Sequence, residues 1–230
     1  NLVKTTNLQP GKINKDKIIV AADGVDLDDF SSKISKEIAR QKVNLPEDKK
    51  IILYSGSFYL YGWKGIDLLL EAANKFSQEY LFVLVGGSDM EIKEIKNKYN
   101  CKNIELISHQ THKKVVYYLK SADVLVLPNK KGQLMSEKYT SPMKLFEYMA
   151  SDRPIVAADL SSLREILDKN TASFFAANDS GSLCRSIEKV LTDKGLGKNT
   201  SSEAYKKVQN YTWQKRSESI LNFIYDTKNS

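Results

Sequence analysis

Short apolar runs that alternate with segments of helical periodicity most constrain what this sequence of 230 residues can fold into. Runs rich in β-branched and aliphatic residues predict strands. They cover residues 18–21, 51–54, 81–85, 104–107, 124–127, 155–157 and 173–175. Most are apolar at consecutive positions, which is typical of strands covered on both faces. The sequence therefore predicts an α/β fold, a Rossmann-like three-layer sandwich with a parallel sheet, followed by C-terminal helices.

The segments between the predicted strands repeat apolar side chains at helical spacing. The clearest sets are Ile66, Leu69, Leu70, Ala73 and Phe76, then Val115, Leu119 and Ala122, and then Leu183, Ile187, Val190 and Leu191. Beyond residue 175 the pattern is helical only. Helices are predicted there over residues 180–193, 202–210 and 212–225, with residues 194–197 and Tyr211 between them.

The length of the chain fits one large domain with appendages. Residues 1–15 have no initiating Met and no apolar core of a signal peptide, so we expect a linker from a preceding domain. Residues 16–200 are expected to form the Rossmann-like domain, and residues 201–230 a C-terminal helical tail. Trp213 and Leu221 belong to an apolar set in the tail that could pack against a further domain.

The surplus of basic residues, 35 Lys and Arg against 28 Asp and Glu, raises the question of a nucleic-acid partner. The lysines stand beside acidic residues, as in residues 90–99, which is typical of a solvated face. Nucleic-acid binding is therefore not expected, and a phosphorylated substrate or an anionic membrane surface is the better use of the charge. The longest apolar runs are far shorter than the roughly 20 residues of a membrane-spanning helix.

The two cysteines, Cys101 and Cys184, lie in separate predicted elements. They lack the spacing of a zinc site or of a disulfide framework. Both are interpreted as reduced, structural thiols, which is typical of a cytosolic protein.

Residues 54–58 follow a predicted strand, and Trp63-Lys64-Gly65 precede a predicted helix. Gly56 permits a tight turn at the end of the strand. Lys64 lies near the N-terminus of the helix, where free N–H groups and the helix dipole favour an anion. By itself this segment fits a diphosphate-binding loop and an ordinary loop with an exposed lysine equally well.

A glycine pair, Gly86-Gly87, follows the strand predicted over residues 81–85. The pair could let a ligand approach the backbone closely. It lacks the G-x-G-x-x-G spacing of a dinucleotide site, so the signal is weak.

The most informative segment runs from Ser141 to Ala150, after a polar loop. Ser141 is a natural N-cap and Pro142 a natural first helical residue, which leaves the N–H groups of Met143 and Lys144 free for a phosphate or sugar oxygen. Glu147 lies one turn further on, where its carboxylate can accept hydrogen bonds from a diol such as a ribose. By spacing alone, a surface ion pair between Glu147 and Lys144 is the favoured alternative.

Taken in order, these segments resemble the C-terminal domain of GT-B glycosyltransferases of the retaining GT4 family. The resemblance covers nearly the whole chain, and the ordered series is more specific than any single segment. It rests on Asp23-Gly24-Val25-Asp26 with Phe30, Tyr54-Ser55-Gly56 with Lys64-Gly65, and residues 69–73, 83–86, 121–128, 141–150 and 153–157.

The resemblance implies that residues 16–200 bind a nucleoside-diphosphate sugar. Lys64 near the diphosphate and Glu147 on the ribose would be the catalytic pair of this domain, and the N–H groups around Met143 and Lys144 would face the phosphate or sugar. The base would lie against residues 107–111, which include His109. The other donor-binding residues implied are Gly56, Ser57, Gly86, Ser141 and Pro142.

Enzymes of this family generally use no bound metal, because basic residues and a helix N-terminus offset the charge of the leaving diphosphate. The sequence has no carboxylate cluster for a cation, and no cofactor or metal is expected. The active site of the GT-B fold is a cleft between two domains. The preceding domain would therefore hold the acceptor, and this domain alone would be inactive.

The sequence departs from the family pattern in three places. Tyr139, with Glu137 as the nearest acid, stands where the family often has the first acid of Glu-x7-Glu. Residues 57–63 lack the arginine that often precedes the phosphate-loop lysine, and Tyr59 or Tyr61 fills the space. Residues 152–154, Asp-Arg-Pro, replace Gly-x-Pro. Arg153 and Arg164 are candidates for salt bridges within the fold, and His109 and His112 are interpreted as loop residues.

The leading hypothesis is the donor-binding domain of a glycosyltransferase that transfers a hexose-type sugar to a glycan or lipid-linked acceptor, with retention, in the synthesis of surface polysaccharides or glycoconjugates. A sugar-nucleotide epimerase of the same fold would need no acceptor. A catalytically silent nucleotide-sugar-binding module would explain the departures. The expected location is the cytoplasm, where the basic surplus could contact anionic lipid at the inner face of the membrane.

Overall fold

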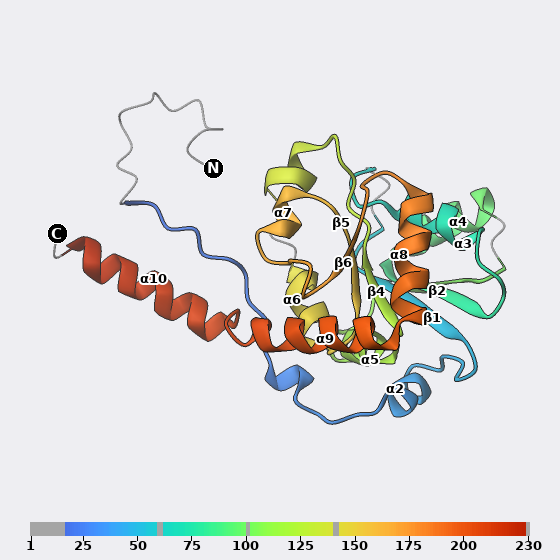
Figure 1. The fold of residues 1–230 in the computed structure, drawn as a ribbon, viewed down its shortest axis with the longest axis horizontal. Coiled ribbons are helices and arrows are strands. Elements are labelled where there is room, and N and C mark those ends of the chain that lie inside the picture. Colours follow the sequence, from blue (N-terminus) through green and yellow to red (C-terminus); the bar gives the residue numbers. More distant parts are fainter. Residues whose placement is uncertain (1–16, 59–61, 100–101, 140–142, 229–230) are drawn as a thin grey trace.

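The computed structural model describes residues 17–58, 62–99, 102–139 and 143–228. They form a six-stranded sheet in the order β3-β2-β1-β4-β5-β6, and every neighbouring pair is parallel (Figure 1). The strands are β1 (Lys50–Ser55), β2 (Tyr80–Gly87), β3 (Ile104–Ser108), β4 (Val124–Leu127), β5 (Ile155–Ala158) and β6 (Ser173–Phe175). This strand order is that of the Rossmann fold, so the predicted fold class is confirmed.

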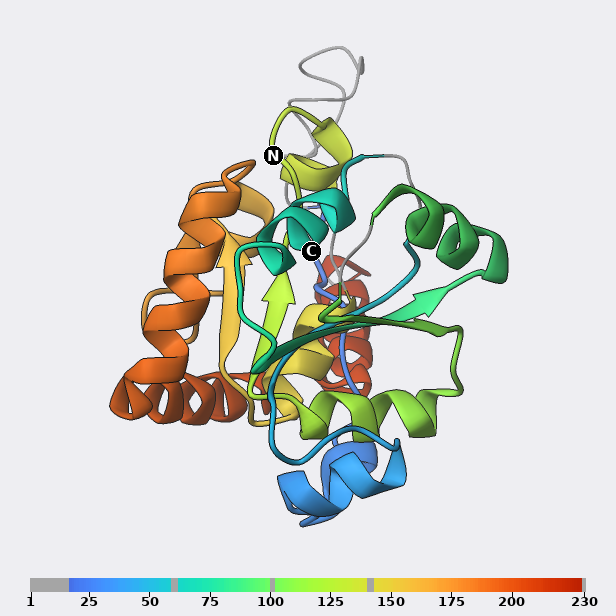
Figure 2. The ribbon, with the colours of Figure 1, turned by 90° about the vertical axis from the view of Figure 1, so that its right-hand side faces the viewer.

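Helices cover both faces of the sheet (Figure 2). Helix α3 packs against α8 on one face, while α5 and α6 lie on the other face, where α2 packs against α5. The helices are α2 (Lys36–Lys42), α3 (Ile66–Ala73), α4 (Asp89–Lys98), α5 (His112–Ser121), α6 (Met143–Ala150), α7 (Ser161–Arg164), α8 (Ser180–Thr192), α9 (Lys194–Val208) and α10 (Trp213–Lys228), with a 3-10 turn η2 (Asp28–Phe30) and a π-helical turn η3 (Met135–Tyr139).

One predicted strand, residues 18–21, is wrong. These residues have no regular secondary structure, and the side chain of Val20 is 72% exposed. The segment runs away from the sheet, toward α10 (Figure 1). A β-branched run has no intrinsic need to be a strand, because strand preference depends on neighbours that complete the ladder and cover the side chains.

The helical end of the chain differs from the prediction at residues 194–197. These residues form the first turn of α9 instead of a break between helices. The Asp193 side chain accepts a hydrogen bond from the Leu196 N–H, and Gly197 lies so close to α8 that an added Cβ would be 3.2 Å from the Val190 carbonyl oxygen. The glycine therefore serves helix packing. The break at Tyr211 is confirmed, while the domain boundaries at residues 15 and 200 stay predictions.

A buried carboxylate, Asp123, joins α2 and α5 to the start of β1. Its Oδ2 accepts hydrogen bonds from the Arg40 guanidinium and from the Ile51 N–H, both at 2.7 Å, and its Oδ1 accepts one from Lys36 at 2.7 Å. Burial by itself would raise the pKa of Asp123, but the hydrogen bonds from Lys36 and Ile51 and the two positive charges lower the pKa below its usual value.

The Arg40 side chain is only 3% exposed, and its other N–H groups bind backbone carbonyls. The carbonyls belong to Pro46, Glu47, Lys49 and Ser121. Arg40 and Asp123 therefore fix the loop that leads into β1, which is the strand that carries the first candidate motif.

Replacement of Asp123 by Asn should destabilise the fold by about 3–5 kcal/mol, because the buried Arg40 charge would lose its counter-charge. Urea unfolding measures the loss. Since the folded pKa of Asp123 lies below the unfolded one, the stabilisation is present at neutral pH and should fade as the pH falls through the folded pKa.

The matched control is Asp159→Asn, which removes the carboxylate that Arg164 pairs with at 2.7 Å on the surface. This change should cost about 1 kcal/mol or less, because both partners are substantially exposed. Equal losses for the two variants would contradict the buried role of Asp123.

Candidate functional site

The loop after β1 touches the last residues of β2 through two glycines. The Gly56 N–H donates to the Val85 carbonyl at 2.8 Å, and a Cβ added to Gly86 would lie 2.7 Å from the Gly56 carbonyl oxygen. Both glycines have positive φ angles, 130° at Gly56 and 116° at Gly86. The space expected at Gly86 for a ligand is thus partly used by the chain itself, because only glycine lets the two backbones meet.

A cavity of about 520 Å³ opens beside this contact, at the carboxyl ends of β1, β2 and β3. The start of α5 and the first turns of α6 complete its wall. Among its lining residues are the candidates Gly56, Ser57, Gly86, His109, Met143, Lys144 and Glu147. Parallel sheets bind ligands at this edge, so the fold brings residues from four separate segments to the expected place.

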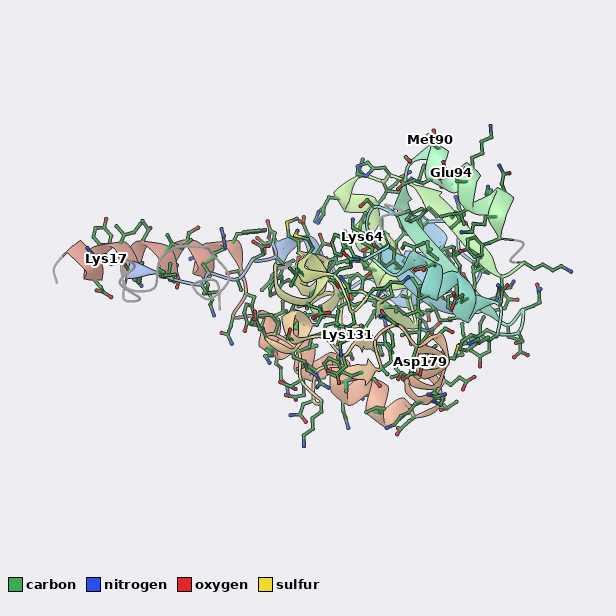
Figure 3. All side chains as sticks on the ribbon, turned by 90° about the horizontal axis from the view of Figure 1, so that it is seen from above. Lys17, Lys64, Met90, Glu94, Lys131 and Asp179 are labelled. Atoms are coloured by element: carbon green, nitrogen blue, oxygen red, sulfur yellow. The ribbon has the colours of Figure 1, made fainter. Side chains whose placement is uncertain are left out.

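Lys64 lies next to the cavity at the N-terminal end of α3. Its ammonium donates a hydrogen bond to the Ser57 hydroxyl and lies 5.3 Å from the centroid of the Trp63 ring. Burial lowers the pKa of Lys64, and the nearby Glu91 carboxylate opposes this shift. In the view from above, Lys64 lies over the middle of the molecule, while Met90 and Glu94 of α4 lie at its edge (Figure 3). The expected phosphate-loop lysine therefore reaches the cavity through Ser57.

The Lys144 side chain does not take the surface position that helical spacing favoured. Its ammonium donates to the Tyr54 hydroxyl at 3.0 Å and lies 4.1 Å from the centroid of the Tyr54 ring. Burial, and then the charge of Lys64, lower the pKa of Lys144 to about 7, while Glu147 acts in the opposite direction. Tertiary packing therefore decides its partner instead of the neighbouring turn of α6.

Glu147 contacts a histidine. Its Oε1 lies 3.0 Å from the His112 Nε2, and the His112 Nδ1 lies 3.3 Å from the Asp29 Oδ2. His112 is the first residue of α5, so its interpretation as a loop residue is wrong, whereas His109 does lie in the loop after β3. The imidazole between two carboxylates was missed at the sequence level, because no local pattern links residues 29, 112 and 147.

Residues 35–207 match the family described as glycosyl transferases group 1. The chain belongs to this family. A phosphatidyl-myo-inositol mannosyltransferase of Mycobacterium leprae (strain TN) is 26% identical over 208 residues, which cover 89% of this chain and 52% of that relative.

Two solved structures show the same fold as this glycosyltransferase domain. Sucrose-phosphate synthase from Thermosynechococcus elongatus has a TM-score of 0.77 and 22% identity, over 92% of this chain and 53% of that one. Anabaena Alr3699/HepE, solved in complex with UDP-glucose, has a TM-score of 0.74 and 15% identity, over 88% and 56%. The chain spans about half the length of all three relatives.

Several candidates of the glycosyltransferase pattern lie elsewhere or outside the described residues. The carboxylate of Glu137 accepts a hydrogen bond from the Gly132 N–H at 2.6 Å, so it is used within its own loop. Arg164 pairs with Asp159 as expected, and Arg153 donates to the Lys120 carbonyl at 3.0 Å. Outside the described residues lie Ser141, Pro142, Tyr59, Tyr61 and Cys101.

The described part of the chain has neither a metal-binding cluster of side chains nor a membrane-spanning helix. Within it, no three His, Cys, Asp or Glu side chains are grouped so that they could hold a metal ion. None of its helices combines the length and apolar character needed to cross a membrane.

The thiol of Cys184 is free and buried.

The glycine contact predicts a specific sensitivity. Gly86→Ala should destabilise the fold by about 1–3 kcal/mol through backbone strain, and by more through the clash with the Gly56 carbonyl. Gly132→Ala is the control, because Gly132 also has a positive φ of 96° but no atom within 4 Å of an added Cβ. Thermal unfolding of both variants should show the larger loss at Gly86, and equal losses would contradict a backbone contact between the β1 loop and the end of β2.

Proposed function

We propose that this chain is the donor-binding domain of a retaining GT-B glycosyltransferase of family GT4. The reaction transfers a hexose-type sugar from a nucleoside diphosphate to a glycan or lipid-linked acceptor, in the synthesis of surface polysaccharides or glycoconjugates. The observation that carries the proposal is the cavity itself, which brings the lysine-bearing loop at Ser57, the first turn of α6 and the Glu147 carboxylate together at the carboxyl edge of the sheet.

The arrangement suits a ligand with an anionic centre and hydroxyl groups at one side. Lys64 and the free N–H groups at the start of α6 would bind the diphosphate, because a helix N-terminus and an ammonium both favour negative charge. The Glu147 carboxylate would accept hydrogen bonds from the ribose hydroxyls, and His112 would hold that carboxylate in place. The base would lie against residues 107–111, beside His109.

Membership in the group 1 family supports sugar transfer as the reaction class. The complex of Anabaena Alr3699/HepE with UDP-glucose supports a nucleoside-diphosphate sugar as the donor. The mannosyltransferase of Mycobacterium leprae supports a hexose.

In the proposed mechanism, the bond between the anomeric carbon and the diphosphate oxygen breaks while the acceptor oxygen attacks from the same face. The leaving phosphate oxygen takes the proton of the acceptor. Lys64 and the N–H groups of α6 stabilise the charge that develops on the diphosphate, which is the role we propose in place of a metal ion.

We place the acceptor on a second, N-terminal domain. The chain spans about half the length of its relatives, and helix α10 projects from the sheet (Figure 1) with exposed apolar side chains. Leu221 is 51% exposed and Tyr225 is 62% exposed, so α10 has apolar surface available for a companion domain. The domain alone would then bind the donor without transferring it. The proposed site of action is the cytoplasmic face of the membrane, to which the net charge of +7 would be attracted.

A catalytically silent nucleotide-sugar-binding module is the second candidate. It is favoured by the departures from the family pattern, because Glu137 is engaged with Gly132 and no arginine stands between residues 57 and 63. Epimerisation of the bound donor without an acceptor would identify the third hypothesis, an epimerase.

Calorimetric titration of the chain with UDP, GDP, ADP and their sugar conjugates tests the donor site. One nucleotide should bind saturably, and Glu147→Ala and Lys64→Ala should each weaken it about tenfold or more, since a hydrogen bond to a charged group contributes about 1.5–3 kcal/mol.

The matched controls are Glu203→Ala and Lys206→Ala, which remove an exposed ion pair on α9. They should leave the affinity unchanged. Absence of binding by every nucleotide tested would refute the donor site, and equal effects of site and control variants would refute the roles of Glu147 and Lys64. Sugar transfer by this domain when it is joined to its N-terminal half would exclude the silent module.

A further inference from the structure

We propose that the side chain of Lys144 supplies a second cation for the donor diphosphate, from below the β1 loop, in a chain whose phosphate loop has no arginine. This inference rests on the proposed function. From the sequence, only the backbone N–H of Lys144 was assigned to the ligand, and by spacing alone a surface ion pair with Glu147 was the favoured alternative for its side chain.

The position of the Lys144 ammonium is the first argument. It lies under the turn at Gly56, where an added Cβ would be 3.4 Å from the Lys144 Nζ. Lys144 also lines the cavity, together with Gly56 and Ser57. The side chain therefore turns toward the loop after β1, on which Lys64 also converges.

The two lysines are linked through a series of hydrogen bonds that meets at Ser57. Lys144 donates to the Tyr54 hydroxyl, which donates to the Ser57 carbonyl at 3.2 Å, and the Ser57 hydroxyl accepts from Lys64. Tyr54 is almost completely buried, and its ring lies against the Lys144 ammonium. The ring face offers no lone pair, so the Lys144 N–H groups that do not bind the Tyr54 hydroxyl remain available for an anion.

Charge balance is the second argument. In the part of the chain that the structure describes, Lys144 forms no ion pair, and the nearest acid on its own helix, Glu147, contacts His112 instead. Two ammonium groups near one loop repel each other, and an anion between them would relieve the repulsion. In the proposed site, the diphosphate of the donor is the anion that would lie between the two ammonium groups.

The groups that face Lys144 define its protonation. They are Tyr54 on β1, Lys64 before α3 and Glu147 on α6, with Glu91 of α4 acting on Tyr54 and Lys64. Burial raises the pKa of Tyr54 well above its usual value, so the phenol stays neutral. Burial and the charge of Lys64 lower the pKa of Lys144 to about 7, so a bound anion would draw a proton onto its side chain.

The test is calorimetric titration with UDP in buffers of different ionisation enthalpy, from about pH 7.5 to about pH 9, which lies well above the second pKa of a phosphate group, about 6. The wild-type chain should take up a proton when UDP binds, and its affinity should fall as the pH rises. Lys144→Met should lose the uptake and bind about tenfold or more weakly, because a charged hydrogen bond is lost.

Lys144→Arg provides a readout that a merely structural role would not give. It should bind UDP with an affinity that no longer depends on pH over this range, because arginine stays charged. Lys144→Gln replaces Lys144→Met if the latter fails to fold, and Lys206→Met is the control for the loss of one positive charge.

Unchanged affinity and proton uptake in the neutral Lys144 variants would overturn the inference while the donor site itself stands. Failure of the wild-type chain to bind UDP, GDP or ADP would overturn the proposed function and this inference with it. The two failures are therefore distinguishable.

Discussion

The parallel pairing of β1 with β2 on one side and β4 on the other is the constraint on which the site depends. The chain moves outward from β1 to β2 and β3, then crosses back to β4 and moves the other way. Helix α3 therefore leaves toward one face of the sheet, and α5 and α6 cover the other. A crevice remains where the two directions diverge, at the carboxyl ends of the strands. The cavity occupies this crevice, and the Asp123–Arg40 cluster fixes the entry of the chain into β1.

The floor of the cavity consists of backbone as much as of side chains. Gly56 and Gly86 bring the β1 loop and the end of β2 into contact, and Phe58 fills the space beside Gly87, where an added Cβ would lie 2.3 Å from the Phe58 ring. A glycine-rich edge therefore has two roles. It packs the chain against itself, and it leaves Gly56 and Ser57 of the β1 loop at the wall of the cavity.

The charges of the site are divided between two networks. Lys64 and Lys144 converge on Ser57, while Asp29, His112 and Glu147 form a carboxylate–imidazole–carboxylate series. The first network suits a phosphate and the second suits hydroxyl groups. Lys144 belongs to the first and Glu147 to the second, and both residues lie on one face of α6. A single helix thereby sets the spacing between the two halves of the proposed ligand.

The sequence by itself determined the strands β1 to β6 and the alternation with helices, because buried strands and amphipathic helices leave a local pattern of apolar residues. It also placed Lys64, Lys144 and Glu147 near the carboxyl edge of the sheet, where the cavity lies. The predictions for residues 18–21 and 194–197 were wrong. Residues 18–21 are extended but have no neighbouring strand, and the glycines in residues 194–197 serve packing between helices instead of a break. The roles of Ser141 and Pro142 stay predictions.

Only the tertiary structure decided which partner each charged side chain takes. Helical spacing favoured an ion pair between Glu147 and Lys144. In the structure, Glu147 contacts His112, which is 35 residues away in the sequence, and Lys144 contacts Tyr54, which is 90 residues away. Local periodicity reports which face of an element is buried. It carries no information on contacts between elements, and those contacts set the desolvation and the charge of a site.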